Sequence, residues 1–227
     1  MTASVSRAAT VAGVQPAFDV VNAKLRSALR DGHESAPTRV AHLGALITWA
    51  EVDHRSPAVT SIRLPDNPTA AWLVAGINDD AITQERRDRR VVIIENPLRA
   101  LRHISDGAGE WVTREVSSAI AGTCRGAIHA AGNLEEAGLY VRCPSRRSAH
   151  KLAAAIGRLA GVAPDIGPRA IRIKSGDIPK VLAHIGIPDD VIAYLHAMHR
   201  AAKDEDRTNS KELDMIEREH RTQMVAR

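Results

Sequence analysis

The hydrophobic and polar positions of this chain follow two periods, about 3.6 residues in some segments and two residues in others. The helical period is clear in residues 16–31, where Phe18, Val21, Leu25 and Leu29 share one face. The period of two marks short strands, each with one apolar and one polar face. A sheet of such strands is covered on one side only. We therefore expect helices on the apolar side and a polar side that is free to bind a partner.

The same pattern predicts two similar series of elements. The first series is helix 38–51, strand 59–64, helix 67–77, strand 90–95 and helix 97–105. The second series is helix 113–131, strand 139–143, helix 146–160, strand 169–174 and helix 176–186. A helix over 189–205 follows, and the charge-dense segment 203–227 is expected to be a solvated or partly ordered helical extension.

An internal repeat accounts for the likeness of the two series. Residues 62–77 align without a gap with residues 141–156 at an offset of 79, and six of the sixteen positions are identical. A unit of about 80 residues is too long for a solenoid repeat. We expect an α+β fold of two duplicated half-domains about a pseudo-two-fold axis, with helices on one face of antiparallel-type sheets. The expected segments are a disordered N-terminus at 1–15, a first half at 16–110, a second half at 111–188 and a helical extension at 189–227.

Composition narrows the classes of function. The net charge of +4 and the pI of about 9.4 permit contact with a polyanion without requiring it. No apolar run approaches the ~20 residues that span a bilayer, and the N-terminus lacks the apolar core of a signal peptide. We expect a cytoplasmic protein, associated with the nucleoid and not with a membrane. Cys124 and Cys143 have no ligand-like spacing and are expected to be buried, reduced thiols.

Each half begins with a helix of small and aliphatic residues, at 43–51 and at 124–132. Small side chains let two helices pack closely, because interaxial distance depends on the residues at the contact. We expect these helices to meet in a seam between the halves, with His129 as a hydrogen-bonded residue within it and Gly132 as a left-handed cap. The expected seam residues are Leu43, Ala45, Ile47, Ala50, Gly126, Ile128, Ala131 and Gly132.

This arrangement resembles the LAGLIDADG fold of homing endonucleases, in which the eighth motif residue is an acid that binds the catalytic metal. Ala50 and Ala131 stand at that position here. Their methyl groups offer no oxygen ligand to a hard cation. Glu51 lies one step later, which turns a helical side chain by about 100°. The resemblance therefore implies the fold without a nuclease site: no catalytic residue, no metal, no cofactor and no enzyme.

The second half carries a narrower resemblance. The segments RGAIHAAGNL, LYVRCPSRRSAHKLAAAIGRLAGVAP and IRIKSGDIPKVLAHIGIPDD are similar to the WhiA regulators of sporulation and cell division in Gram-positive bacteria. The resemblance covers roughly residues 115–205 and extends to 36–110 only through the internal repeat. It implies a LAGLIDADG-like domain that does not cut DNA, followed by a helix-turn-helix domain that binds it. Because the chain ends at Arg227, we expect the helix-turn-helix domain to be missing.

With this fold, the polar sheet face is the candidate surface for double-stranded DNA, since Arg and Lys pair with phosphate or read guanine. The candidate residues are Arg63, Arg142, Arg172 and Lys174 on strands, and Arg146, Arg147 and Lys151 at the start of a helix. A basic loop at 86–90 also suits phosphate contact. Solvated charge explains the strand and helix clusters equally well, and it explains the loop better, because Glu85 and Asp88 offset the charge there. The halves are not equivalent, because Ile93 and Glu95 replace Arg172 and Lys174. The first half is therefore expected to act partly as a scaffold or a protein contact.

Two functions remain open at this point. The first is a non-catalytic DNA-binding transcriptional regulator of the WhiA type. The second is a protein-interaction module of the same fold, for example for another transcription factor; an active endonuclease is the least favoured. No small-molecule substrate is evident, because no glycine-rich phosphate loop or nucleophile elbow occurs. His196 and His199 lack a third ligand for a metal and are expected at the surface, and the helix-turn-helix-like segment 177–198 is apolar enough to belong to the core.

Overall fold

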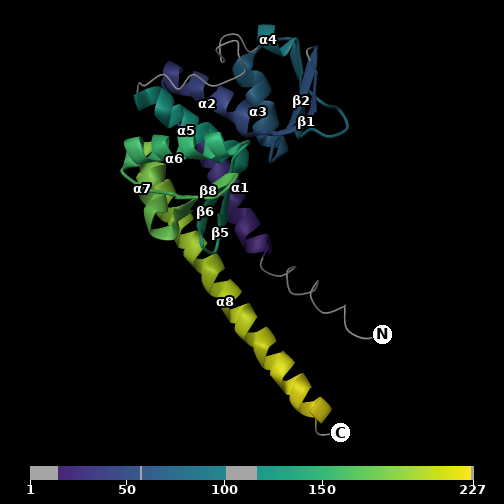
Figure 1. Ribbon diagram of the computed structural model, residues 1–227, viewed down its shortest axis with the longest axis vertical. Coiled ribbons are helices and arrows are strands. Elements are labelled where there is room, and N and C mark those ends of the chain that lie inside the picture. Colours follow the sequence, from purple (N-terminus) through teal and green to yellow (C-terminus); the bar gives the residue numbers. More distant parts are fainter. Residues whose placement is uncertain (1–14, 57, 101–116, 226–227) are drawn as a thin grey trace.

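The computed structural model describes residues 15–56, 58–100 and 117–225 (Figure 1). The predicted disordered start and the helical segments 101–105 and 113–116 lie outside the described residues. The first half contains α2 (Ala36–Trp49), β1 (Glu51–Arg55), β2 (Val59–Arg63), α3 (Asn67–Ile77), β3 (Ile82–Gln84), β4 (Val91–Glu95) and α4 (Pro97–Ala100). The second contains α5 (Ser117–Ala131), β5 (Gly132–Glu135), β6 (Gly138–Arg142), α6 (Arg146–Ala160), β7 (Asp165–Ile166), β8 (Ala170–Lys174), η1 (Ser175–Asp177) and α7 (Ile178–His184). Helix α1 (Gln15–Asp31) precedes the two halves and α8 (Asp189–Val225) follows them.

The two halves have the same sheet topology. Both sheets are antiparallel and four-stranded, with the orders β1-β2-β4-β3 and β5-β6-β8-β7. The central pairs also share their register after a shift of 79 residues: Arg63 faces Val91 in one sheet and Arg142 faces Ala170 in the other. A slip of one residue would exchange the two faces of a strand. The matched register therefore confirms the internal repeat and the duplicated α+β fold.

The helix after the second strand is capped in the same way in both halves. Asp66 accepts a hydrogen bond from the Thr69 N–H at 2.7 Å at the start of α3, and Ser145 accepts one from the Ser148 N–H at 3.1 Å at the start of α6. Such caps satisfy backbone donors that a helix leaves free and contribute about 1 kcal/mol each. Both caps stand 79 residues apart, so local capping follows the repeat.

Four strands lie outside the elements that the sequence pattern predicts: β1, β3, β5 and β7. All four are the edge strands of their sheets. All five residues of β1 are exposed, so no apolar alternation marks it. The helix predicted to reach residue 51 ends at Trp49 instead. The left-handed cap predicted at Gly132 is wrong, because this residue begins β5 and is not among those with positive φ.

Helix α1 ties the two halves together. Its residues Val21, Leu25 and Leu29 are buried in the core of the second half. On the same helix, the Arg26 guanidinium lies 2.7 Å from Asp66, the cap of α3 in the first half. In Figure 1, α1 runs alongside α8 behind the second sheet.

Asn22 of α1 also closes the free edge of β5. Its Oδ1 accepts the Leu134 N–H at 2.6 Å and its Nδ2 donates to the Leu134 carbonyl at 3.2 Å. A side-chain amide thus takes the place of a neighbouring strand. Edge strands that stay open invite pairing with other chains, so α1 protects the second sheet as well as packing on it.

Helix α8 continues without a break from the predicted helix 189–205 into the predicted helical extension. Its first turns pack on the second half, where Ile192, Leu195 and Ala202 are buried. Together with buried Val181 and Leu182 of α7, they confirm that the segment 177–198 belongs to the core. The rest of α8 continues to Val225 and extends away from both halves (Figure 1).

Candidate nucleic-acid interface

The polar face of the second sheet presents three cations together with two acids, Asp165 opposite Arg172 and Glu135 opposite Gly138. Arg142 on β6 and Arg172 and Lys174 on β8 are exposed, whereas the residues that alternate with them are buried. The register places Arg172 opposite Tyr140, one diagonal step from Arg142, which corresponds to roughly 7 Å. Within the described ranges, no ion pair or hydrogen bond engages the Arg172 or Lys174 side chain.

Arg142 lies at the boundary between the two sheets. Its Nη2 is 3.7 Å from a carboxylate oxygen of Glu51, the first residue of β1. Both side chains are more than half exposed, at 58% and 54%. An exposed pair of this kind contributes little, typically below about 1 kcal/mol, so Arg142 remains available to another anion.

Arg63 occupies the matching position in the first sheet but is held by acids. Its Nη2 lies 2.9 Å and its Nε 3.3 Å from the two oxygens of Asp53, and its Nη1 contacts Asp88. The backbone N–H of Arg90 and the Arg63 guanidinium lower the pKa of Asp88 to about 2, so this carboxylate stays ionised. Arg63 is therefore neutralised within its own half.

The start of α6 forms a second basic region. Arg146, Arg147 and Lys151 are all exposed, and Arg147 and Lys151 take part in interactions within the protein. Arg146 and His150 line an open hollow of about 330 Å³ against the turn between β7 and β8. A larger hollow of about 610 Å³ occupies the matching place in the first half, between the start of α3 and the basic loop 86–90. Both regions flank the sheets and do not lie on their polar faces.

Helices α2 and α5 meet closely between the halves. A Cβ at Gly126 would lie 2.3 Å from the His42 carbonyl oxygen and 2.6 Å from the Ala45 Cβ. A Cβ at Gly122 would lie 2.2 Å from the Thr38 carbonyl oxygen. Only glycine fits at these contacts, so the backbones of the two helices touch.

The predicted seam residues divide between this contact and the two cores. Ala45 and Gly126 face each other directly, and Ile128 is fully buried in the core of the second half together with Ala45. Leu43, Ile47 and Ala50 instead face the core of the first half. Ala131 packs against the core of the second half, and Gly132 already belongs to β5.

A chain of buried polar side chains crosses the seam. The His42 Nδ1 lies 2.5 Å from Glu34, its Nε2 lies 2.9 Å from the His129 Nδ1, and the His129 Nε2 lies 3.0 Å from the Thr69 hydroxyl. Arg30 donates to the same hydroxyl at 3.4 Å. These residues come from α1, the segment before α2, α2, α5 and α3. The chain of bonds therefore joins both halves and α1.

One assignment of protons satisfies the hydroxyl and both imidazoles of this chain, whereas the second carboxylate oxygen of Glu34, Oε2, has no hydrogen bond among the described residues and lies 3.6 Å from the Arg39 Nη1. The Thr69 hydroxyl donates to His129, the His129 Nδ1–H donates to the His42 Nε2, and the His42 Nδ1–H donates to Glu34. Both imidazoles are then neutral. Burial lowers the pKa of His42 in spite of the nearby carboxylate, and burial and neighbouring positive charges lower that of His129 further. Burial alone would raise the pKa of Glu34, but His42, Arg125 and Arg39 hold it below its ordinary value.

Arg125 completes the network and compensates the charge of Glu34. Its Nε lies 2.8 Å from Glu34, and the guanidinium also donates to the carbonyls of Leu29 and Ile185 at 2.8 and 2.9 Å. Those carbonyls lie near the C-terminal ends of α1 and α7, where cations are favoured. Arg125 is fully buried, so its hydrogen bonds must replace water.

The order hydroxyl, imidazole, carboxylate resembles that of a nucleophilic relay, but the side chains are inaccessible. Thr69, His42 and His129 each have 0% exposure. A catalytic hydroxyl must reach its substrate, and this one faces only protein. The network therefore positions helices.

The places where an endonuclease carries its metal ligands hold no oxygen ligand. Ala50 caps α2, Ala131 ends α5, and Glu51 points to Arg142. Within the ranges that the structure describes, no group of three His, Cys, Asp or Glu side chains could hold a metal ion.

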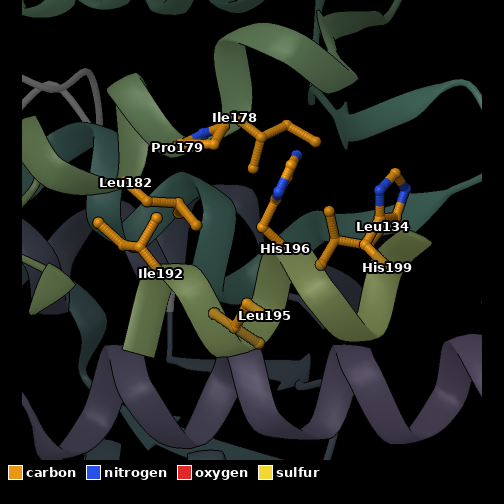
Figure 2. Close-up of a pocket in the computed structure, with 8 residues that line it drawn as sticks. All are labelled: Leu134, Ile178, Pro179, Leu182, Ile192, Leu195, His196 and His199. Atoms are coloured by element: carbon orange, nitrogen blue, oxygen red, sulfur yellow. The ribbon is translucent and has the colours of Figure 1, made fainter. Parts of the chain in front are cut away.

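His199 departs from the prediction of a surface residue. It is only 3% exposed, its Nε2 lies 2.7 Å from the Glu135 carbonyl, and its ring meets Phe18 edge-on. His196 is half-buried one turn away, and both histidines border an apolar cavity of about 10 Å³ (Figure 2). That volume holds at most one water, so the cavity is a packing defect between α7 and α8.

The two cysteines are free and buried, as predicted. Burial raises the pKa of Cys124 to about 12 and also raises that of Cys143. Neither thiol is a nucleophile at neutral pH.

Two solved structures share this architecture. A crystal structure of the N-terminal LAGLIDADG domain of DUF199/WhiA matches with a TM-score of 0.54 and 14% identity, over 74% of this chain and 90% of that one. A crystal structure of full-length DUF199/WhiA from Thermatoga maritima matches with a TM-score of 0.55 and 13% identity, over 86% and 71%. The chain has the LAGLIDADG-like fold of WhiA. At these identities the likeness to WhiA concerns the fold, and no family model and no curated protein matches the sequence.

Sequence reasoning missed most of the buried network. His129 was expected in the seam, but Glu34, His42, Thr69 and Arg125 were not singled out. A usable signal exists for Arg125, which stands among small and apolar residues of a predicted seam helix. A charge at such a position is buried and requires partners.

Among the described helices, none is both long and apolar enough to cross a bilayer.

Proposed function

We propose that this protein is a non-catalytic DNA-binding regulator of the WhiA type, acting in transcription and in the control of sporulation or cell division. The observation that supports it is the exposed polar face of the second sheet, where Arg142, Arg172 and Lys174 lie close together on a rigid scaffold. Cations gathered on one exposed face suit contact with the phosphates of duplex DNA. The absence of an acid at Ala50 and Ala131 favours binding without cleavage.

Binding to duplex DNA at several salt concentrations tests this proposal. We expect retention of a fluorescent 20-base-pair duplex at micromolar protein and low ionic strength, and a steep loss of affinity as salt rises. The same protein should leave a supercoiled plasmid intact in the presence of Mg²⁺. No retention at low salt would refute DNA binding, and cleavage would refute the non-catalytic assignment.

A protein-interaction module of the same fold is the second candidate. The observation that favours it is the polar face of the first sheet, where Glu51, Asp53 and Glu95 outnumber Arg63. An acidic face suits a basic protein segment, such as part of another transcription factor. If duplex DNA does not bind at low salt, this candidate replaces the first.

A further inference from the structure

Because the two halves are duplicated, the charge at each position of one sheet can be compared with the charge at the equivalent position of the other sheet. The central strand pairs have one register in both sheets, so Arg63 corresponds to Arg142, Ile93 to Arg172, and Glu95 to Lys174. Each pair of residues occupies the same point on the same scaffold. At these three positions the two faces therefore differ in side chain and not in backbone register.

The acids that hold Arg63 have no counterparts in the second half. Asp53 lies at the irregularity in β1 between Val52 and His54, and β5 pairs with β6 without such a break. Asp88 corresponds to Gly167 at the shift of 79. Within the described residues, Arg142 is consequently left with a single carboxylate, at 3.7 Å, whereas Arg63 has two in direct contact.

These acids also oppose an approaching phosphate directly. For DNA to bind Arg63, its phosphate would have to displace Asp53 and Asp88, which hold three of the guanidinium nitrogens. Glu95 would then face the DNA at the position where the second sheet offers Lys174. Like charges placed together at an interface disfavour the complex.

We propose that duplex DNA contacts the second half alone, through Arg142, Arg172 and Lys174, and that the carboxylates of the first half exclude it from the other sheet. One chain then contacts about half of the duplex surface that a symmetric pair of sheets would cover. This inference rests on the proposed function, and it specifies which face of the protein carries it.

Matched substitutions at repeat-equivalent positions test the inference. Affinity for the 20-base-pair duplex is measured by fluorescence anisotropy across a salt series. Three phosphate contacts predict a ~40-fold loss between about 50 and about 200 mM salt. Arg142→Ala should reduce this loss to ~12-fold, because one contact is removed. Arg63→Ala should leave both affinity and salt dependence unchanged.

A second variant tests whether charge is the reason. Ile93→Arg combined with Glu95→Lys reproduces the pattern of the second half on the first, at exposed or half-exposed positions. We expect tighter binding and a steeper salt dependence, by roughly two contacts. Circular dichroism of every variant establishes that it remains folded.

The possible outcomes distinguish a failure of this inference from a failure of the proposed function. If Arg63→Ala weakens binding as much as Arg142→Ala, both halves bind DNA and the inference fails while the proposed function stands. If the double variant gains no affinity, the charges at positions 93 and 95 are not what excludes DNA from the first sheet, and the cause that the inference assigns is wrong. If the unmodified protein does not bind at low salt, the proposed function fails and the inference with it.

Discussion

At the scale of single residues, we expect the buried ion pair of Arg125 and Glu34 to have the largest effect on the free energy of unfolding. Removing one member of a buried pair leaves an uncompensated charge, which typically costs 3–5 kcal/mol. We expect Arg125→Met to lower the free energy of unfolding by about this amount in urea titrations. Glu34→Gln in the same background should recover part of the loss, since the unpaired carboxylate is gone. Strictly additive effects would show that the two side chains do not interact.

The two seam histidines make stability depend on pH in a definite direction. Each has a folded-state pKa below its ordinary value of 6.5, because burial disfavours the imidazolium. The unfolded chain therefore binds more protons below about pH 6.5, and stability falls as the pH decreases, by up to about 1.4 kcal/mol per unit for each histidine. Urea unfolding between about pH 8 and pH 5 measures this slope.

A comparison of variants assigns that slope to the seam. Replacing His42 and His129 together with Gln should flatten the fall below about pH 6.5. His184→Gln serves as the control, because His184 is exposed and, within the described residues, hydrogen-bonds only to the Lys180 carbonyl. An equal flattening in both variants would mean that the seam histidines are not the source.

At the scale of elements, the contact of α2 with α5 makes a sharp prediction about glycine. Gly126→Ala places a methyl group within 2.6 Å of the Ala45 Cβ and closer still to the α2 backbone. The helices must separate, and overpacking of this kind typically costs about 1–3 kcal/mol. Thermal unfolding followed by circular dichroism measures the loss.

Gly157 of α6 provides the matched control for this element. A Cβ there meets only the Val162 carbonyl oxygen at 3.6 Å, an ordinary contact. Alanine is the better helix former, so Gly157→Ala should stabilise the protein by up to about 1 kcal/mol. An equal loss of stability in both variants would show that the effect of Gly126→Ala is not specific to the seam contact.

The elements also show how far sequence can predict this fold. Helices and central strands were predictable because their apolar residues face a core, as at α3, where the predicted and observed bounds coincide at 67 and 77. The edge strand β1 was not predictable from the sequence, because its five residues are exposed and its pairing partner is set by tertiary contacts. The candidate DNA-binding residues of β6 and β8 followed from alternation alone. The neutralisation of Arg63 could not be predicted in this way, because Asp53 reaches it from β1 and Asp88 from the loop between β3 and β4.

At the scale of the whole molecule, the two halves do not have independent cores. Ala45 and Trp49 of α2 belong to the core of the second half, although α2 precedes the first sheet. Arg26 and Arg30 of α1 reach Asp66 in the first half from a helix packed on the second. Separating the halves would therefore expose apolar surface and break the polar network at the same time.

This shared core predicts that the molecule unfolds as one unit. Native-state hydrogen exchange should give amides in β2 and β6 the same highest free energy of opening, since neither sheet can lose its structure while α2 and α5 stay packed. Arg125→Met should lower both values together. Exchange of β2 at a clearly lower free energy than β6 would instead show that the first half opens alone. In that case the seam would be a hinge between two separately stable units, and the fixed placement of the two polar faces would no longer follow from the packing.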